Sequence, residues 1–357
     1  MYQTGEKIKV TVFGQSHSEA IGAVIEGLPA GIKLDMERIY AFMRRRAPGR
    51  DKFSTPRKEA DLPEIISGLA DGKTCGAPIT AVIKNGDTKS KDYENLRLVP
   101  RPGHSDFTAF VKYGGCNDIR GGGQFSGRMT APLCFAGAIC MQLLEEKGIY
   151  IGAHIESVHG IHDERFNPIN VTKDELDAIK AKDFCVISDK QGEAMKAEID
   201  RVRGNLDSVG GTIECAVIGM PTGVGGPLFG GIEGRISSAI FAIPAVKGIE
   251  FGSGFSASEM YGSENNDSFY FDEDCVKTKT NNHGGILGGI SSGMPILFRT
   301  AIKPTPSIAR EQDSVNLKTK TSEKLVISGR HDPCIVQRAV PVIEAAAAIT
   351  ILDMLGE

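Results

Sequence analysis

Runs in which apolar and polar residues alternate occur along the whole chain, and each predicts a short β-strand. Period-two alternation turns one face of a strand toward a core and the other toward polar surroundings. Such runs cover residues 7–13, 23–28, 79–84, 150–161, 248–255, 296–303 and 324–328, and a turn followed by a strand lies within 206–221. We therefore expect β-structure from the first residues almost to the last.

Between these runs, apolar residues recur at helical spacing. Asp35 is a suitable N-cap for a helix that ends on the basic run 44–46, and Thr172 with Glu175 forms a capping box for a helix through Lys182. Further helices are predicted within 189–203, within 234–248 up to its proline, and after residue 334.

The segment 129–146 differs from the other helical segments because it is apolar on nearly every face. A helix without a polar face is buried on all sides, so this segment predicts a central helix of the core. Ser126 and Thr130 are both candidate N-caps for it. Strand and helix signals follow one another without a linker, a repeat or a low-complexity tract, so we expect residues 1–357 to form one domain with mixed α and β layers.

Composition narrows the class of protein. The chain has 357 residues, with 41 basic against 45 acidic ones and a net charge of -4, which gives it no overall attraction to nucleic acid or to an anionic membrane. Its 8 cysteines occur singly, without a CxxC pair, as expected for reduced and mostly buried thiols. No secretory leader or membrane-spanning run is recognised, so we expect a cytoplasmic protein.

Two glycine-rich stretches carry the chemistry expected of a ligand site. In the stretch 101–128, arginine, lysine, histidine and aspartate surround the run 121–123 just before the apolar helix, a composition typical of anion binding. The second stretch, 281–295, suits the flat ring or the phosphate of a cofactor, although a purely structural glycine corner gives the same pattern.

Other candidates are weighed one by one. The pair Ser16 and His17 lies in a glycine-bounded loop at a strand end, where a side chain can face a ligand or simply solvent. The basic run 44–46 offsets a helix dipole, but more basic residues follow up to residue 58 and favour a loop that binds a polyanionic small molecule. Asp332 stands where it can cap a helix or act as a base.

Three histidines lie close together at positions 154, 159 and 162. Their spacing fits neither the i, i+4 pair of a helix nor a regular strand alternation, and no carboxylate cluster joins them. A metal site is therefore not favoured here.

Taken together, the motifs resemble one family, chorismate synthase. They occur in the order of that family and span nearly the whole chain. The set comprises GQSHS at 14–18, the arginine run before Pro48 and Gly49, RPGH at 101–104, KYG at 112–114, RGGG at 120–123, NNHGGILGGISSG at 281–293, KPTPS at 303–307 and GRHDPC at 329–334.

The resemblance implies an α+β fold, a β-α-β sandwich with a helical core between antiparallel β-sheet layers. It implies the loss of phosphate and of a C6 proton from 5-enolpyruvylshikimate 3-phosphate, which forms chorismate in the shikimate pathway. It also implies reduced FMN as cofactor, although the reaction has no net redox change, and a homotetramer. The reductant for the flavin is left open between NADPH used by the enzyme itself and an outside donor.

Residue roles follow by the same resemblance. His17 matches the acid that assists the departing phosphate, His104 the histidine that serves the reduced flavin, and Asp332 the carboxylate that takes part in removing the substrate proton. The expected substrate-binding residues are Ser16, Arg46, Lys52, Arg101 and Arg128. The expected flavin-binding residues are Gln124, Phe125, Ser126, Pro244, Ala245, Gly288, Lys303, Pro304, Thr305, Pro306, Ser307 and Arg330.

The chain departs from the family pattern in the loop after the triple glycine. Gln124 and Phe125 stand where the family usually has arginine and serine, which removes hydrogen bonds to the flavin worth roughly 1 to 3 kcal/mol each. Three functions therefore stay open: an active chorismate synthase, a flavin-dependent relative that acts on another phosphorylated acid, and a paralogue that only binds ligand or partner subunits.

Overall fold

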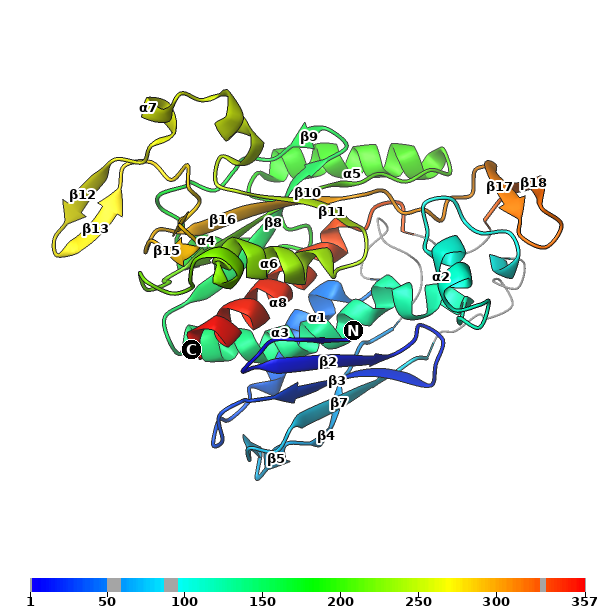
Figure 1. Ribbon diagram of the computed structural model, residues 1–357, viewed down its shortest axis with the longest axis horizontal. Coiled ribbons are helices and arrows are strands. Elements are labelled where there is room, and N and C mark those ends of the chain that lie inside the picture. The colour runs from blue at the N-terminus through cyan, green and yellow to red at the C-terminus, as the bar shows by residue number, and fades with distance from the viewer. Residues whose placement is uncertain (1, 50–58, 87–95, 328–331, 357) are drawn as a thin grey trace.

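The fold consists of two antiparallel sheets with helices packed between them, as Figure 1 shows for the computed structural model. Residues 2–49, 59–86, 96–327 and 332–356 are described. The first sheet has the order β1-β2-β3-β7-β4 and the second the order β11-β16-β10-β8-β9. The first comprises β1 (Gln3–Thr4), β2 (Lys9–Gly14), β3 (Ala20–Glu26), β7 (Ile79–Lys84) and β4 (Glu64–Ser67). The second comprises β11 (Val246–Phe251), β16 (Ile296–Ile302), β10 (Gly211–Ile218), β8 (Tyr150–Val158) and β9 (Ile161–His162).

Four helices form the layer between the sheets: α1 (Met36–Arg46), α3 (Thr130–Glu145), α6 (Ile232–Phe241) and α8 (Val336–Leu355). Helices α3 and α8 pack closely, and a Cβ added to Gly137 of α3 would lie only 2.2 Å from the Cβ of Ala345 on α8. Nearly every residue of both helices is buried. The expected helical core between antiparallel sheets is confirmed.

Helix α8 connects the layers through two buried carboxylates. Glu344 accepts two hydrogen bonds from Arg45 of α1, at 2.5 and 3.0 Å, and one from the backbone N–H of Ala153 on β8 at 2.9 Å. Asp353 accepts the backbone N–H groups of residues 6 to 8 and the guanidinium of Arg235 on α6. The last long helix therefore holds elements from both ends of the chain.

Most elements appear where the sequence predicts them. Asp35 caps α1 by accepting from the backbone N–H of Arg38, and the capping box at Thr172 opens α4 (Lys173–Lys180). Helix α5 (Asp189–Gly204) follows, and both helices pack against β8 or β9. The second predicted strand begins earlier than expected, at Ala20.

Three expectations about local structure were wrong. The run 150–161 is interrupted at His159, whose φ of 48° turns the chain between β8 and β9. A strand predicted for 324–328 is instead β18 (Thr321–Leu325), paired with the unpredicted β17 (Gln312–Asn316). Neither candidate N-cap serves α3, since Ser126 caps the preceding 3₁₀ turn, Gly127–Met129.

Sequence patterns also missed several short elements. These are the small strands β5 (Leu69–Ala70), β6 (Lys73–Thr74), β14 (Ile286–Leu287) and β15 (Ile290–Ser291), the helices α2 (Asp106–Lys112) and α7 (Gly262–Asn265), and the projecting hairpin of β12 (Phe269–Asp272) and β13 (Cys275–Thr278). The strands of that hairpin have exposed side chains at all positions but one, so no buried face requires an alternation of apolar and polar residues.

One helical stretch, Gly127–Glu145, is long and apolar enough by composition to cross a bilayer, which corrects the expectation that the chain holds no such run. Of the 18-residue window that qualifies, 83% is buried inside the fold. That degree of burial is typical of a core helix in a globular protein. All eight cysteines are free, and Cys134, Cys140, Cys185, Cys215 and Cys334 are buried, in line with the predicted mostly buried thiols.

Candidate active site

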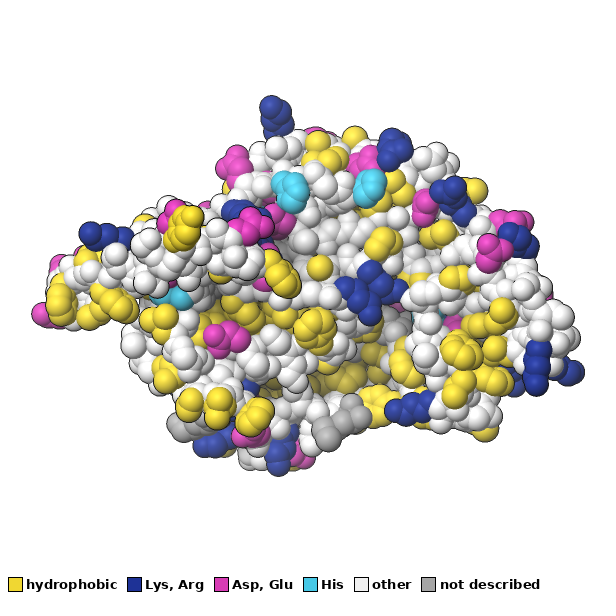
Figure 2. Space-filling model, turned by 45° about the horizontal axis from the view of Figure 1, so that its top comes forward, with side chains coloured by type: hydrophobic (Ala, Val, Ile, Leu, Met, Phe, Trp, Pro, Cys, Tyr) yellow, Lys and Arg dark blue, Asp and Glu magenta, His cyan; other side chains and the backbone are white. Residues whose placement is uncertain are grey.

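A cavity of about 580 Å³ lies where the stretch 101–128, the start of α8 and the segments 241–247 and 303–307 meet. This volume is in the ordinary range for sites that bind small molecules and cofactors. Figure 2 shows a hollow in one face of the protein with Lys and Arg side chains gathered beside it. The residues of the sequence-based site that line the cavity are Arg46, Arg101, His104, Gln124, Phe125, Ser126, Arg128, Pro244, Ala245, Lys303, Thr305, Pro306, Ser307 and Asp332.

Other expected site residues do not line this cavity. Ser16 and His17 lie behind its wall, and Pro304 is likewise absent from the lining. Gly288 belongs to the turn between β14 and β15, which packs against the segment 225–231. Lys52 and Arg330 lie outside the described residues.

Of the triple glycine, Gly121 lines the cavity, and Ser16 and His17 lie against it. All three glycines have positive φ, at 59°, 83° and 55°, a conformation that glycine adopts without strain. A Cβ added to Gly121 would lie 2.5 Å from Ser16 Oγ and 2.7 Å from His17 Nε2. The backbone N–H of Ser16 donates to the carbonyl of Gly123 at 3.1 Å, which fixes the two loops together.

Three residues of the 101–106 segment form a compact polar group at the cavity. Asp106, in the first turn of α2, accepts from Nε of Arg101 at 2.7 Å and from Nη2 at 2.9 Å. Its Oδ1 also lies 2.6 Å from Nδ1 of His104. Burial alone would raise the pKa of Asp106, but the hydrogen bonds from Arg101 and His104 outweigh it and hold that pKa well below its ordinary value. Asp106 is therefore ionised.

Arg46 and Arg128 reach the cavity from different elements and share one carboxylate. Asp61 binds Arg46 through one oxygen and Arg128 through the other, and Glu59 lies 3.1 Å from Nη1 of Arg128. Arg46 also donates to Thr130 Oγ1 at 3.2 Å. Asp61 adopts a φ of 51°, an uncommon conformation for a residue with a side chain. Burial would raise the pKa of Asp61, yet the two arginines outweigh burial and lower it.

Asp332 lines the cavity just before α8 and pairs with Arg338 at 2.7 Å. Nε of Arg338 donates to the carbonyl of Arg46 at 3.1 Å, which links α8 to the end of α1. Burial lowers the pKa of Arg338, and the charge of Asp332 offsets part of that effect. The carboxylate therefore stands at the cavity beside a fixed cation.

The opposite side of the cavity has cations and open polar groups. Lys303 lies beside Lys247, and burial together with the charge of Lys247 lowers the pKa of Lys303. Thr305 Oγ1 is buried and has no hydrogen-bond partner among the described residues. Ala245 has a φ of 75°, and such backbone strain in a residue other than glycine concentrates at functional sites. These groups could hold the phosphate and ring edge of a cofactor.

The basic run 44–46 divides into three roles. Arg44 is exposed, Arg45 is paired with Glu344 in the core, and Arg46 faces the cavity. The basic residues between 50 and 58 that suggested a polyanion-binding loop lie outside the described residues.

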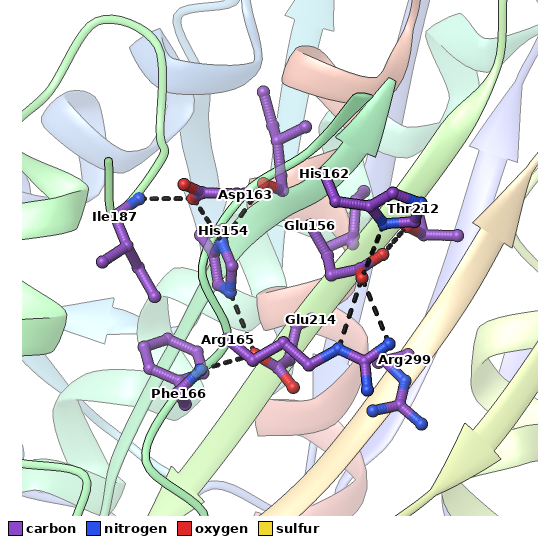
Figure 3. A network of polar contacts seen from close by, with 12 residues as sticks. His154, Glu156, His162, Asp163, Arg165, Phe166, Ile187, Thr212, Glu214 and Arg299 are labelled. Carbon is purple, nitrogen blue, oxygen red and sulfur yellow. Dashed lines mark hydrogen bonds and ion pairs between the residues drawn. The ribbon is translucent and has the colours of Figure 1, made fainter. Parts of the chain in front are cut away.

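The three clustered histidines each pair with carboxylates instead of converging on one point. His154 lies between Asp163 and Glu214, while His159 contacts Glu198. His162 contacts Glu156 at 3.1 Å, as Figure 3 shows. Among the described residues, no group of three or more such side chains could hold a metal ion.

Sequence patterns did not reveal the partners of the charged site residues. Asp106 and Arg338 were not singled out, although each lies five or six residues from the group it pairs with. That spacing is a usable signal. The pairing of Asp61 with the cavity arginines had no signal in the sequence, because Arg128 is distant along the chain and only the fold brings it close to Asp61.

Comparison with known proteins gives one consistent result. The profile of the family described as chorismate synthase matches residues 8–355. A chorismate synthase of Lancefieldella parvula is 45% identical, over 98% of this chain and 95% of that protein. One from Methanococcus maripaludis is also 45% identical, over 98% of this chain and 96% of that protein. A crystal structure of chorismate synthase superposes with a TM-score of 0.77 at 29% identity, covering 99% of this chain and 92% of that one.

Proposed function

The chain belongs to the chorismate synthase family, and from this premise we propose how its cavity carries out the family's reaction. The reaction is a carbon–oxygen lyase step in aromatic amino acid biosynthesis. In 5-enolpyruvylshikimate 3-phosphate, the C–O bond to phosphate breaks, a proton leaves C6, and the new double bond gives chorismate.

The observation that carries the proposal is the convergence of distant segments on one cavity. Arg46 comes from α1, His104 and Arg128 from the glycine-rich stretch, Lys303 from the end of β16 and Asp332 from the entrance to α8. Such a set of cations with one carboxylate suits a substrate that carries a phosphate and carboxylates and must lose a proton.

Arg46 and Arg128 are assigned to the anionic groups of the substrate. Both guanidinium groups are buried and line the cavity. Nη2 of Arg128 has no hydrogen-bond partner among the described residues. Arg46 is assigned on the resemblance, because its Nε, Nη1 and Nη2 already donate to Thr130, Asp61 and the carbonyl of Gly127. The planar guanidinium binds carboxylate or phosphate through paired N–H groups. Ser16 and Lys52 complete the proposed substrate-binding set, the latter on the resemblance alone.

Three residues are assigned to proton movements. His17, which lies against Gly121 and does not line the cavity, is assigned on the resemblance as the acid that assists the departing phosphate. Asp332, which accepts a hydrogen bond from Arg338 at 2.7 Å, receives the proton lost from the substrate. His104 would donate a proton to the reduced cofactor or stabilise negative charge on it.

The cofactor proposed for the cavity is reduced FMN, which lends an electron transiently during the elimination. Buried Thr305 Oγ1 offers an unpaired hydroxyl, and Lys303 and Lys247 offer cations for the phosphate. Gln124, Phe125 and Ser126, Pro244 and Ala245, and the segment 304–307 complete the proposed contacts. Gly288 and Arg330 are retained only on the resemblance. NADPH is the proposed electron source to be tested against an outside reductant.

A homotetramer in the cytoplasm is proposed as the working form. Exposed large apolar side chains support self-association, because a soluble monomer rarely leaves many of them in water. Phe269 and Phe271 on the projecting hairpin are 64% and 76% exposed, and Phe229 is 98% exposed. Light scattering should give the mass of four chains, and aspartate at both hairpin phenylalanines should lower it. A monomeric mass for the unaltered protein would contradict the tetramer.

Incubation of the protein with 5-enolpyruvylshikimate 3-phosphate and photoreduced FMN, without oxygen, tests the function. We expect chorismate absorbance and an equal amount of released phosphate. Absence of both, with FMN still binding in a titration, would favour a relative that acts on another phosphorylated acid. Absence of both activity and FMN binding would favour a paralogue that binds other ligands or subunits. Replacing photoreduction by NADPH then decides whether the protein reduces its own flavin.

A further inference from the structure

We propose that Asp106 is a positioning residue that fixes the tautomer of His104, and that Arg101 holds Asp106 in place instead of binding the substrate. This inference rests on the proposed function only for the role of His104 in the reaction. The arrangement itself follows from the distances among three side chains at the start of α2.

The proton between His104 and Asp106 can be located by elimination. The carboxylate of Asp106 is ionised, so both of its oxygens can only accept hydrogen bonds. Its Oδ1 lies 2.6 Å from Nδ1 of His104, and two lone pairs at that distance would repel each other. Nδ1 therefore carries the hydrogen, and in the neutral ring Nε2 is left as the acceptor.

Arg101 does not compete for that nitrogen. Its Nη2 lies 3.1 Å from Nδ1 and 3.4 Å from Nε2 of His104. Nearly equal distances to both ring nitrogens place Nη2 over the face of the ring, away from the lone-pair axis of either. The same Nη2 has a proper acceptor in Asp106 Oδ1 at 2.9 Å.

The donors of Arg101 are almost fully used within the protein. Nε and Nη2 donate to Asp106, and Nη1 donates to Ser307 Oγ at 3.1 Å. The backbone N–H of Arg101 also donates to Asp106 Oδ2 at 3.1 Å. Because the side chain is only 4% exposed, it would have to break these bonds to bind a substrate carboxylate through two N–H groups.

The free nitrogen of His104 lies close to the buried backbone of Gly122, where a larger residue would crowd the ring. A Cβ added to Gly122 would lie 3.1 Å from Nε2 of His104, and Gly122 has a φ of 83°. Both His104 and Ser307 line the cavity. The Arg–Asp–His group therefore fixes the hydrogen on one ring nitrogen of a histidine that lines the cavity.

Replacing Asp106 by asparagine tests the proposal because the structure dictates how the amide will turn. The Oδ2 position receives two fixed donors, Nε and the backbone N–H of Arg101. The Oδ1 position receives one fixed donor, Nη2 of Arg101, and the hydrogen of His104, which can move to the other ring nitrogen, so the amide oxygen will occupy the Oδ2 position. The amide NH₂ then faces Nδ1 of His104 and donates to it. We expect Asp106→Asn to reverse the tautomer, so that the hydrogen moves to Nε2.

The tautomer is read by solid-state NMR of protein labelled with ¹⁵N-histidine, without cofactor or substrate, and His104→Gln identifies the signals. In the unaltered protein we expect neutral His104 to carry its hydrogen on Nδ1, and in Asp106→Asn on Nε2. In the turnover assay we expect kcat to fall at least about 100-fold, the usual contribution of a positioned acid or base, with KM for the substrate nearly unchanged.

The matched control is Asp163→Asn, which alters the carboxylate at another buried histidine, His154. Neither residue lines the cavity, so kcat and the His104 tautomer should stay unchanged. A hydrogen on Nε2 in the unaltered protein, or an unchanged kcat after the tautomer reverses, would overturn the proposal. If the unaltered protein makes no chorismate, the proposed function fails. The NMR spectrum of the unaltered protein still decides the tautomer on which the positioning role depends, even if the variant does not fold.

Discussion

Stability of this protein should depend on pH through His154, a fully buried histidine of β8 in the second sheet. Its Nδ1 lies 3.1 Å from Asp163 and its Nε2 lies 3.0 Å from Glu214, as Figure 3 shows. Burial lowers the pKa of His154, but the two carboxylates raise it by more, to about 8. Both carboxylates also accept backbone N–H groups, so they hold neighbouring loops as well.

The size of the effect follows from that pKa. The ordinary value is 6.5, and a rise to about 8, at about 1.4 kcal/mol for each pKa unit, corresponds to about 2 kcal/mol of stability. Because the pKa is raised in the folded protein, this contribution is fully present below pH 6.5 and is lost as the pH rises through about 8.

Urea denaturation of the unaltered protein and of His154→Gln, at fixed protein concentration from pH 5.5 to 9, measures this contribution. Groups that do not contact His154 titrate equally in both proteins, so the difference between their unfolding free energies isolates the histidine together with its two carboxylates. We expect that difference to shrink by about 2 kcal/mol over this range. The control His159→Gln alters a histidine that is 57% exposed, and its difference should stay constant. A difference for His154→Gln that is independent of pH, or that grows as pH rises, would refute the reasoning.

Three further predictions concern the cavity. Asp61→Asn removes the buried negative charge that pairs with both cavity arginines, so urea denaturation should show a loss of about 3 to 5 kcal/mol in unfolding free energy near neutral pH. Because the pKa of Asp61 is lowered, this loss should shrink only in acid, below the ordinary value of 3.8. Gly121→Ala would place a methyl group 2.7 Å from His17 Nε2, so kcat should fall. The control Gly234→Ala has nothing within 4 Å of its new methyl group and should leave kcat unchanged. Equal kcat values for the two variants would exclude the close packing of Gly121 against His17. Gln124→Arg restores a cation at the proposed flavin site, and calorimetric titration should show FMN binding about tenfold tighter, whereas unchanged affinity would place the flavin elsewhere.

How far the fold could be predicted depended on burial. Strands β7 and β16 appear within a residue of the predicted bounds, because burial requires apolar residues at the positions that face the core. The hairpin β12–β13 is almost entirely exposed, so its pattern carries no such signal. His159 shows another limit, since a single positive φ divided a run whose alternation looked continuous.

For the site, residue types were visible in the sequence but their partners were not. The motifs identified His104 and Arg101 as functional, and the resemblance assigned Arg101 to the substrate. Only the structure reveals that Nε and Nη2 of Arg101 donate to Asp106, because hydrogen-bond geometry depends on side-chain placement at the scale of tenths of an ångström. The pairing of Asp61 with Arg128 spans 67 residues and has no local pattern at all.

Helix α8 is synthesised long after the first strands with which it shares the core. Asp353, near the end of the chain, receives hydrogen bonds from the backbone of residues 6 to 8, and the entrance of α8 carries the carboxylate that faces the cavity. The first strands leave the ribosome long before their partner exists, and at 5 to 20 residues per second the wait is roughly tens of seconds. Throughout that interval the first sheet lacks α8 against its helical layer. The nascent chain therefore lacks both a packing partner of its first strands and the carboxylate at the cavity until α8 has been made.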